Sequence, residues 1–268
     1  MTFHKGWTLG AMLAIVAAPL AAFHEPGWSF EDNFGVGNLG GFSGRVDYYA
    51  PQSPWGFWAN FDDLDFDDNF APGGPGDTST WDSFSVGGTY MWDNGLELDA
   101  SWWSTRLEVK NVGTIDVEDD GFGLRLIYGQ HFGGEVANEE NGWWKLSAGV
   151  LFYEGDAFGG TWERDGSCFT LNAQLRVPLG TTWGSYGRYD LGCESDDYSG
   201  LPDTAASVYP QRYELGVTYP ISPGWQFFAG WEHILWEFGD FWSWGFDEGT
   251  DGLKLGLIFD SGLLNGGY

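Results

Sequence analysis

Charged side chains stand at alternate positions in several segments of this chain, with apolar residues between them. Arg125 lies between Leu124 and Leu126, and a single tyrosine separates Arg188 from Asp190. Guanidinium and carboxylate groups on one face of a strand either pair with each other or line a polar path. The positions that we single out are Arg45, Asp99, Arg125, Arg176, Arg188, Asp190, Arg212 and Glu214. We expect these side chains to face an enclosed space and to set its selectivity.

The acidic segment 62–69 is a second candidate site. Its carboxylates are those of Asp62, Asp63, Asp65, Asp67 and Asp68, and carboxylate oxygens are the ligands that Ca²⁺ prefers. The segment lacks the early glycine and the closing glutamate of a helix–loop–helix calcium site. Two interpretations therefore stay open, a solvated acidic loop and a Ca²⁺ site. We expect no other cofactor.

Catalytic chemistry has little support in the sequence. An enzyme needs a nucleophile or activated water beside a base, and His131 and His233 stand at no recognisable spacing from a serine. We therefore expect no enzymatic activity. The only cysteines, Cys168 and Cys193, predict a disulfide in an oxidising compartment. Strand parity puts Cys168 inward and Cys193 outward, so one of them should lie in a bulge or a loop.

The elements that would position these residues are β-strands. In the segment 168–177 the residues Phe169, Leu171, Ala173, Leu175 and Val177 share one face and polar residues share the other, which is the period of two of a strand. Candidate strands of this kind cover 28–36, 40–49, 55–62, 82–92, 95–104, 120–131, 143–153, 167–177, 182–192, 210–219, 225–236 and 252–259. They predict about twelve strands, or ten if weak segments such as 55–62 lie outside the wall.

The connections between these strands alternate in length. The short ones are 50–54, 93–95, 178–181 and 220–224, with 132–142 intermediate, and the long ones are 63–81, 105–119, 154–166, 192–209 and 237–251. Ten-residue alternating segments, aromatic residues at their ends and this alternation of loops are typical of transmembrane barrels. The chain resembles bacterial outer-membrane β-barrel proteins as a broad class over nearly all of 23–268. This resemblance implies an all-β, antiparallel, up-and-down barrel with long acidic extracellular loops.

The first 22 residues are predicted to be a signal peptide. Lys5 precedes an apolar stretch from Thr8 to Ala18 that is short for a membrane helix, and Ala21-Ala22 offers a cleavage site. Residues 23–268 would then form the barrel, exported through the periplasm to the bacterial outer membrane.

The net charge of the chain limits the classes of partner that it can bind. It has 39 acidic and 11 basic residues, a net charge of −28, which disfavours nucleic acid and anionic surfaces. Strand parity puts seven of the basic residues inside the barrel, namely Arg45, Arg125, Lys145, Arg176, Arg188, Arg212 and Lys254. The expected partners are outer-membrane lipid, small polar solutes, and divalent cations or the lipopolysaccharide phosphates that such cations bridge.

Three functions remain open from the sequence. The favoured one is a porin-like channel that passes small polar solutes through a narrow lumen lined by arginine and carboxylates. The alternative is a closed structural or surface-interaction barrel whose acidic loops bind cations. The third is a secreted soluble β-protein that binds sugars through its tryptophans.

Overall fold

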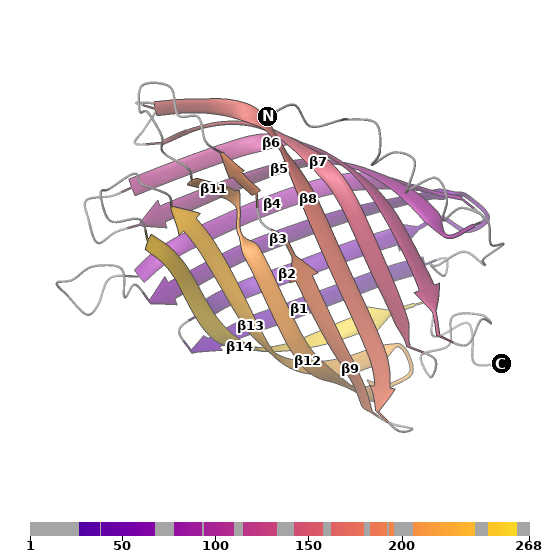
Figure 1. The fold of residues 1–268 in the computed structure, drawn as a ribbon. Coiled ribbons are helices and arrows are strands. Elements are labelled where there is room, and N and C mark those ends of the chain that lie inside the picture. The colour runs from indigo at the N-terminus through magenta and orange to yellow at the C-terminus, as the bar shows by residue number, and fades with distance from the viewer. Residues whose placement is uncertain are drawn as a thin grey trace.

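The structure is a computed structural model that describes residues 27–37, 39–67, 78–92, 94–109, 115–132, 142–157, 162–179, 183–191, 193–195, 206–238 and 246–261. Within these residues, antiparallel strands join edge to edge into one closed barrel of twelve strands (Figure 1). The expected signal peptide, 1–22, lies outside the described residues.

The wall strands follow each other around the barrel in chain order, and the last strand pairs with the first. They are β1 (Gly27–Gly37), β2 (Leu39–Tyr49), β3 (Trp55–Asp67), β4 (Thr78–Met91), β5 (Leu96–Val109), β6 (Ile115–His131), β7 (Trp143–Ala157), β8 (Trp162–Leu179), β9 (Trp183–Asp190), β12 (Gln211–Ser222), β13 (Trp225–Phe238) and β14 (Phe246–Asp260). The prediction of about twelve strands is confirmed. The ten-strand alternative is wrong, because β3 contains 55–62 and pairs with both β2 and β4.

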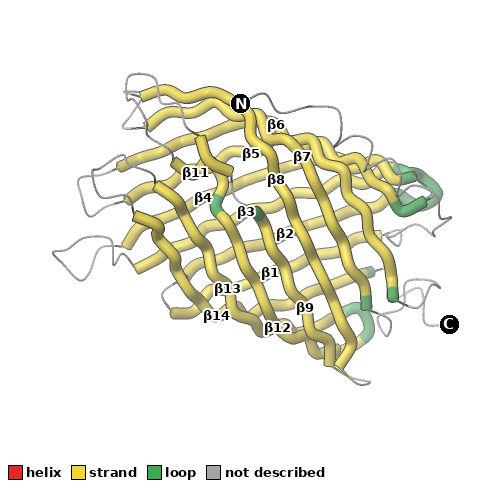
Figure 2. Tube along the Cα trace, in the orientation of Figure 1, coloured by secondary structure: helices red, strands yellow, loops and turns green. Residues whose placement is uncertain are grey.

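Short turns gather at one end of the barrel, which we call the turn end, and the opposite end is called the loop end (Figure 2). The hairpin expected at 93–95 is at the turn end, where the amide of Trp92 donates to the carbonyl of Leu96 over 2.9 Å. Gly95 has a φ of 79° there, a left-handed conformation that glycine adopts without a Cβ clash.

Apolar side chains cover the outside of the wall. Phe122, Leu124 and Leu126 on β6 are 63%, 49% and 38% exposed, whereas Gly121 and Gly123, on either side of Phe122, face inward and are buried. So much exposed apolar surface is stable only against lipid or another apolar surface. The outward face therefore has the character of the lipid-facing band of an outer-membrane barrel.

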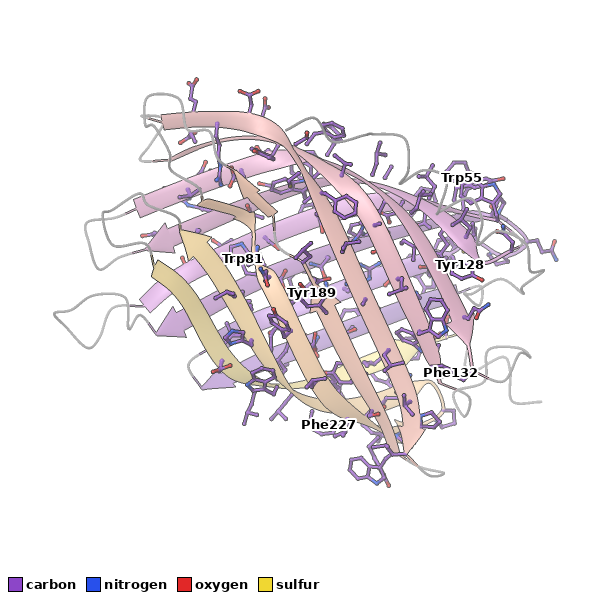
Figure 3. All side chains as sticks on the ribbon, in the orientation of Figure 1. Trp55, Trp81, Tyr128, Phe132, Tyr189 and Phe227 are labelled. Carbon is purple, nitrogen blue, oxygen red and sulfur yellow. The ribbon has the colours of Figure 1, made fainter. Side chains whose placement is uncertain are left out.

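Aromatic residues form a girdle at the turn end of this band. The ring pairs Trp28–Tyr48, Trp55–Tyr90, Tyr128–Trp144, Trp183–Tyr219 and Trp225–Phe259 have centroids 4.5 to 5.7 Å apart. Figure 3 shows Trp55, Tyr128 and Phe132 together at this end. Tryptophan and tyrosine are favoured at headgroup level because one part of the ring system is apolar and another is polar.

The strands extend further toward the loop end than predicted. β3 continues to Asp67 and β6 begins at Ile115, so the expected loops 63–81 and 105–119 are partly strand. The outward positions of these extensions carry carboxylates such as Asp63, Asp65 and Glu118. Here the outward face is acidic rather than apolar, so the apolar–polar alternation that marked the strands in the sequence disappears.

Two short strands prolong the wall beyond β9 and β12. β10 (Cys193–Ser195) pairs with β11 (Ala206–Tyr209), and Ala206 also pairs with Phe238 of β13. Pro210 lies between β11 and β12, and its missing N–H explains why the strand is interrupted there. No helix within the described ranges is long and apolar enough to cross a membrane.

Candidate functional site

The inside of the barrel is lined by charged side chains that the sequence parity placed there. Asp99, Asp190, Arg212 and Glu214 are each no more than 6% exposed, although they stand on a wall whose other face is apolar. Arginine and carboxylate groups are almost never buried without partners. The geometry of the site is therefore set by the ion pairs and hydrogen bonds that these side chains form.

One luminal cluster surrounds the indole of Trp58 on β3. Its Nε1 donates to Oδ2 of Asp99 over 2.5 Å, and the hydroxyl of Thr89 donates to the same oxygen over 3.2 Å. The guanidinium groups of Arg45 and Arg125 lie 4.8 and 5.6 Å from the centroid of the Trp58 ring. The indole of β3 thus joins two cations and one carboxylate from three other strands, β2, β5 and β6, into one unit.

Both arginines of this cluster also have carboxylate partners. Arg45 forms a two-pronged pair with Asp47, with Nε to Oδ2 at 2.8 Å and Nη2 to Oδ1 at 2.6 Å. Arg125 Nη2 lies 3.2 Å from Oδ1 of Asp99. The side chains of Arg45 and Arg125 keep 37% and 28% exposure, so water reaches these cations from inside the barrel.

A second cluster spans the lumen. Arg212 on β12 places Nη2 3.2 Å from Oδ1 of Asp62 on β3, and its guanidinium is 5.6 Å from the ring centroid of Trp81 on β4. In the closed sheet, β13, β14, β1 and β2 separate β12 from β3 on the shorter side. Arg212 therefore connects opposite sides of the wall and obstructs the lumen at its level.

Further charges hold Arg212 in place. Its Nε lies 2.6 Å from Oε1 of Glu232, which also lies 3.4 Å from Nζ of Lys254. Lys254 is 3.5 Å from Glu214, and the hydroxyl of Tyr186 donates to Glu214 over 2.9 Å. We call Asp62, Arg212, Glu214, Glu232 and Lys254 the cross-lumen network.

The three other predicted residues lie on the arc from β8 to β13. Arg188 Nε is 2.7 Å from Oδ2 of Asp190, whose other oxygen accepts from Asn172. Arg176 Nη2 donates to Gln226 Oε1 over 2.7 Å. Arg188 keeps 32% exposure of its side chain, so it presents charge to the lumen.

The acidic segment 62–69 is divided by its strand. Asp62 points inward and is 4% exposed, whereas Asp63 and Asp65 lie on the exposed outward face. Asp67 ends β3, and Asp68 lies outside the described residues. The prediction of a loop from residue 63 onward is wrong over 63–67, which belong to β3, and a strand cannot direct successive carboxylates to one ion. Among the described residues, no three His, Cys, Asp or Glu side chains are placed to hold a metal.

The disulfide expected in the sequence involves Cys168, which is disulfide-bonded in the structure. The only other cysteine of the chain is Cys193, at the start of β10. The ladder between β10 and β11 shifts register between Cys193 and Glu194, which fits the expectation that one of the two cysteines lies in a bulge or a loop. Cys168 packs against the buried residues Trp103, Leu151 and Tyr153.

Sequence parity missed several members of the site. Asp62 was considered only as a member of the acidic segment, although it ends the predicted strand 55–62, and Trp58 and Trp81 were not considered as luminal partners. Arg164 and Asp119 form another buried ion pair, with Nε to Oδ1 at 2.7 Å, in segments that were predicted to be loops. Continuing the period of two from 55–62 through Leu64 would have indicated that Asp62 faces inward.

Comparisons with known proteins give matches among solved structures alone. No protein-family model matches the chain, and no curated protein matches it significantly. Solved structures similar to it are outer-membrane β-barrels. The β domain of the Bordetella autotransporter BrkA has 14% identity and a TM-score of 0.46, covering 88% of this chain and 100% of that one. The translocator domain of NalP from Neisseria meningitidis has 13% identity and a TM-score of 0.46, covering 94% of each. The KdgM porin has 8% identity and a TM-score of 0.41, covering 87% of this chain and 98% of that one.

Proposed function

We propose that this protein is a narrow outer-membrane channel for small polar solutes and that the cross-lumen network constricts it. The observation that carries the proposal is the charged lining of the lumen, crossed by the contact between Arg212 and Asp62. Apolar side chains of similar volume fill an interior at equal or greater stability than buried ion pairs. A charged lining suits a path that water and polar solutes enter.

The arrangement of the charges supports passage along the wall. Arg45, Arg125 and Arg188 keep about a third of their side chains exposed inside the barrel, while each is held by a carboxylate. Rows of opposite charge beside a water-filled path select among small solutes by their charge. Opening would require that Arg212 leave Asp62 and the ring of Trp81, while Glu232 would stay beside Arg212 on the neighbouring strand.

The experiment is a conductance measurement on refolded protein in a planar bilayer. The double variant Arg212→Ala/Asp62→Ala removes both ends of the contact across the lumen. Removing one end alone would leave the other buried charge without its partner across the lumen, and breaking a buried pair in this way costs up to about 3–5 kcal/mol. We expect the wild-type protein to show small, brief openings and the double variant to show steady conductance that is severalfold larger.

The matched control is Arg164→Ala/Asp119→Ala. This pair is also buried, but its strands β6 and β8 are separated only by β7, so it does not cross the lumen. The control should conduct as the wild-type protein does. Each of the three proteins must first be shown to be folded by a band shift between unheated and boiled gel samples. If none of them then conducts ions, the proposal of a channel is contradicted.

A second function is favoured by the outward face at the loop end. Carboxylates face each other there across neighbouring strands, as in the register pairs Asp120–Glu154, Glu154–Asp165 and Asp156–Glu163. In that case the barrel is a closed surface-interaction protein that holds divalent cations or cation-bridged lipopolysaccharide. Loss of calcium-dependent binding to lipopolysaccharide vesicles in Glu154→Gln would support it, and calcium-independent behaviour would contradict it. Enzymatic activity is expected of neither function.

A further inference from the structure

The outward face of the barrel is hollowed over β8, β9 and β12. A groove of about 540 Å³ runs there over Ala173 and Gly187, and its sides are formed by Leu146, Leu175, Leu215, Tyr189, Tyr213 and Trp231. The groove exists because small residues stand at neighbouring outward positions among large ones. We call it the outer groove.

A row of hydrogen-bonding side chains borders this groove. Tyr189, Tyr213, His233 and Asp251 are successive cross-strand neighbours on β9, β12, β13 and β14. His233 Nδ1 lies 2.8 Å from Oδ1 of Asp251, and the Tyr213 hydroxyl donates to Gln211 over 3.0 Å. The ring of Trp231, which lines the groove, stacks on His233 at 5.8 Å with 12° between their planes.

The position of this row fits a membrane boundary. His233 is eight residues along β13 from Trp225, a member of the aromatic girdle. Eight residues span about 27 Å along a strand, and a strand tilted by about 40° rises about 20 Å over that length in an apolar band about 25 Å tall. The polar row therefore lies near the loop-end edge of the lipid-facing band, and the groove lies below it.

The position of the outer groove and the side chains around it indicate which kind of ligand fills it. Water does not fill an apolar groove in the hydrocarbon region, and an empty groove would lose dispersion contacts, so an acyl chain is the natural filling. Above the chain, the carboxylate of Asp251 is 58% exposed, and its neighbour His233 has the rings of Tyr213 and Trp231 on either side at 5.9 and 5.8 Å. A carboxylate beside aromatic rings suits an ammonium group, and the net charge of −28 disfavours an anionic headgroup.

We propose that the outer groove and the polar row bind one phospholipid with an ammonium headgroup. An acyl chain lies over Ala173 and Gly187, and the ammonium group lies beside Asp251. This site is on the outside of the wall and does not depend on the lumen being a channel.

The test is native mass spectrometry of the detergent-purified protein with phosphatidylethanolamine or phosphatidylglycerol of identical acyl chains. We expect the wild-type protein to retain one phosphatidylethanolamine and little phosphatidylglycerol. Ala173→Leu fills the groove and should weaken retention about tenfold, which corresponds to the loss of a few packing contacts. Asp251→Asn removes the partner of the ammonium group and should abolish the preference between the two lipids.

The matched control is Ala100→Leu. Ala100 is an exposed outward alanine on β5, with Gly88 and Leu124 as its cross-strand neighbours, and it lies away from the groove. Its substitution should leave lipid retention unchanged.

Equal retention of both lipids by the wild-type protein, or unchanged retention in Ala173→Leu, would overturn the proposal. A dimer that Ala173→Leu dissociates would also overturn it, because a second copy would then fill the groove. Asp251→Asn provides the decisive comparison if Ala173→Leu fails to fold.

Discussion

At the scale of single residues, the luminal cations act through the carboxylates beside them. Arg188 pairs with Asp190, and Asp190 also accepts from Asn172. Arg188→Ala would leave the carboxylate of Asp190 facing the lumen without that cation, so the local charge would become more negative. We predict that the reversal potential in a salt gradient shifts toward cation selectivity. Arg176→Ala, which removes a cation bound to Gln226 and Thr218, should shift it in the same direction.

Reversal potentials that do not change in either variant would remove these residues from the path of permeating ions. Arg106→Ala is the control for this measurement. Arg106 is exposed and pairs with Asp116 on the outward acidic face, so its removal should leave selectivity unchanged. A shift in this control equal to that in Arg188→Ala would mean that charge outside the lumen sets the selectivity.

Parity identified the luminal arginines because it depends only on which face a residue occupies. It could not identify their partners. The contact between Arg212 and Asp62 joins residues 150 positions apart, and their distance depends on how the barrel closes and staggers. Trp58 was missed for a similar reason, since its hydrogen bond to Asp99 depends on how β3 and β5 are placed relative to each other in the sheet. Residue direction is a local property, whereas pairing across a lumen is a global one.

At the scale of elements, glycine on one strand makes room for an aromatic side chain on the next. A Cβ built on Gly87 would lie 2.6 Å from the ring of Trp58, whereas one on its neighbour Gly88 would meet its nearest atoms at 3.8 Å. Gly87→Val should therefore displace the indole from Asp99 and destabilise the barrel by about 1–3 kcal/mol, the usual cost of overpacking. The midpoint of urea unfolding in lipid vesicles measures this effect.

Gly88→Val provides the matched comparison for that prediction, because it adds the same side chain one residue away on the lipid-facing side of β4. It should leave the unfolding midpoint within error of the wild-type value. Equal destabilisation by both substitutions would show that β4 is sensitive to valine in general. In that case the packing of Trp58 on Gly87 would not be what holds the indole in place.

The element boundaries show where the sequence was insufficient. The centres of all twelve wall strands were predicted, because lipid on one side and charge on the other produce a clear alternation of residue types. The loop-end extensions of β3, β5, β6, β7 and β8 were not, because water replaces lipid outside them and carboxylates replace the apolar residues. The outward sequence then resembles that of a loop, although the backbone continues to pair.

At the scale of the whole molecule, charged residues are distributed unevenly between the inner and outer faces of the barrel and along its axis. The inside combines arginine and carboxylate, the middle of the outside is apolar, and the outward face near the loop end is acidic. There Glu154 lies in register between Asp120 and Asp165, and all three are exposed. Like charges directly opposite each other destabilise a sheet, so this face should lower the stability of the barrel when salt does not screen it.

Removing one of these carboxylates should relieve the repulsion between neighbouring strands. Glu154→Gln should raise the free energy of unfolding by about 0.2–1 kcal/mol at low ionic strength, the range of a cross-strand pair. The gain should fade at 1 M salt, where the screening length is about 3 Å. Asp116→Asn should do the opposite at low salt, because Asp116 lies 2.7 Å from Arg106 and its loss removes an attraction. Urea unfolding at two salt concentrations separates the two variants. Destabilisation by Glu154→Gln at low salt would mean that bound cations already neutralise this face and that Glu154 helps to hold them.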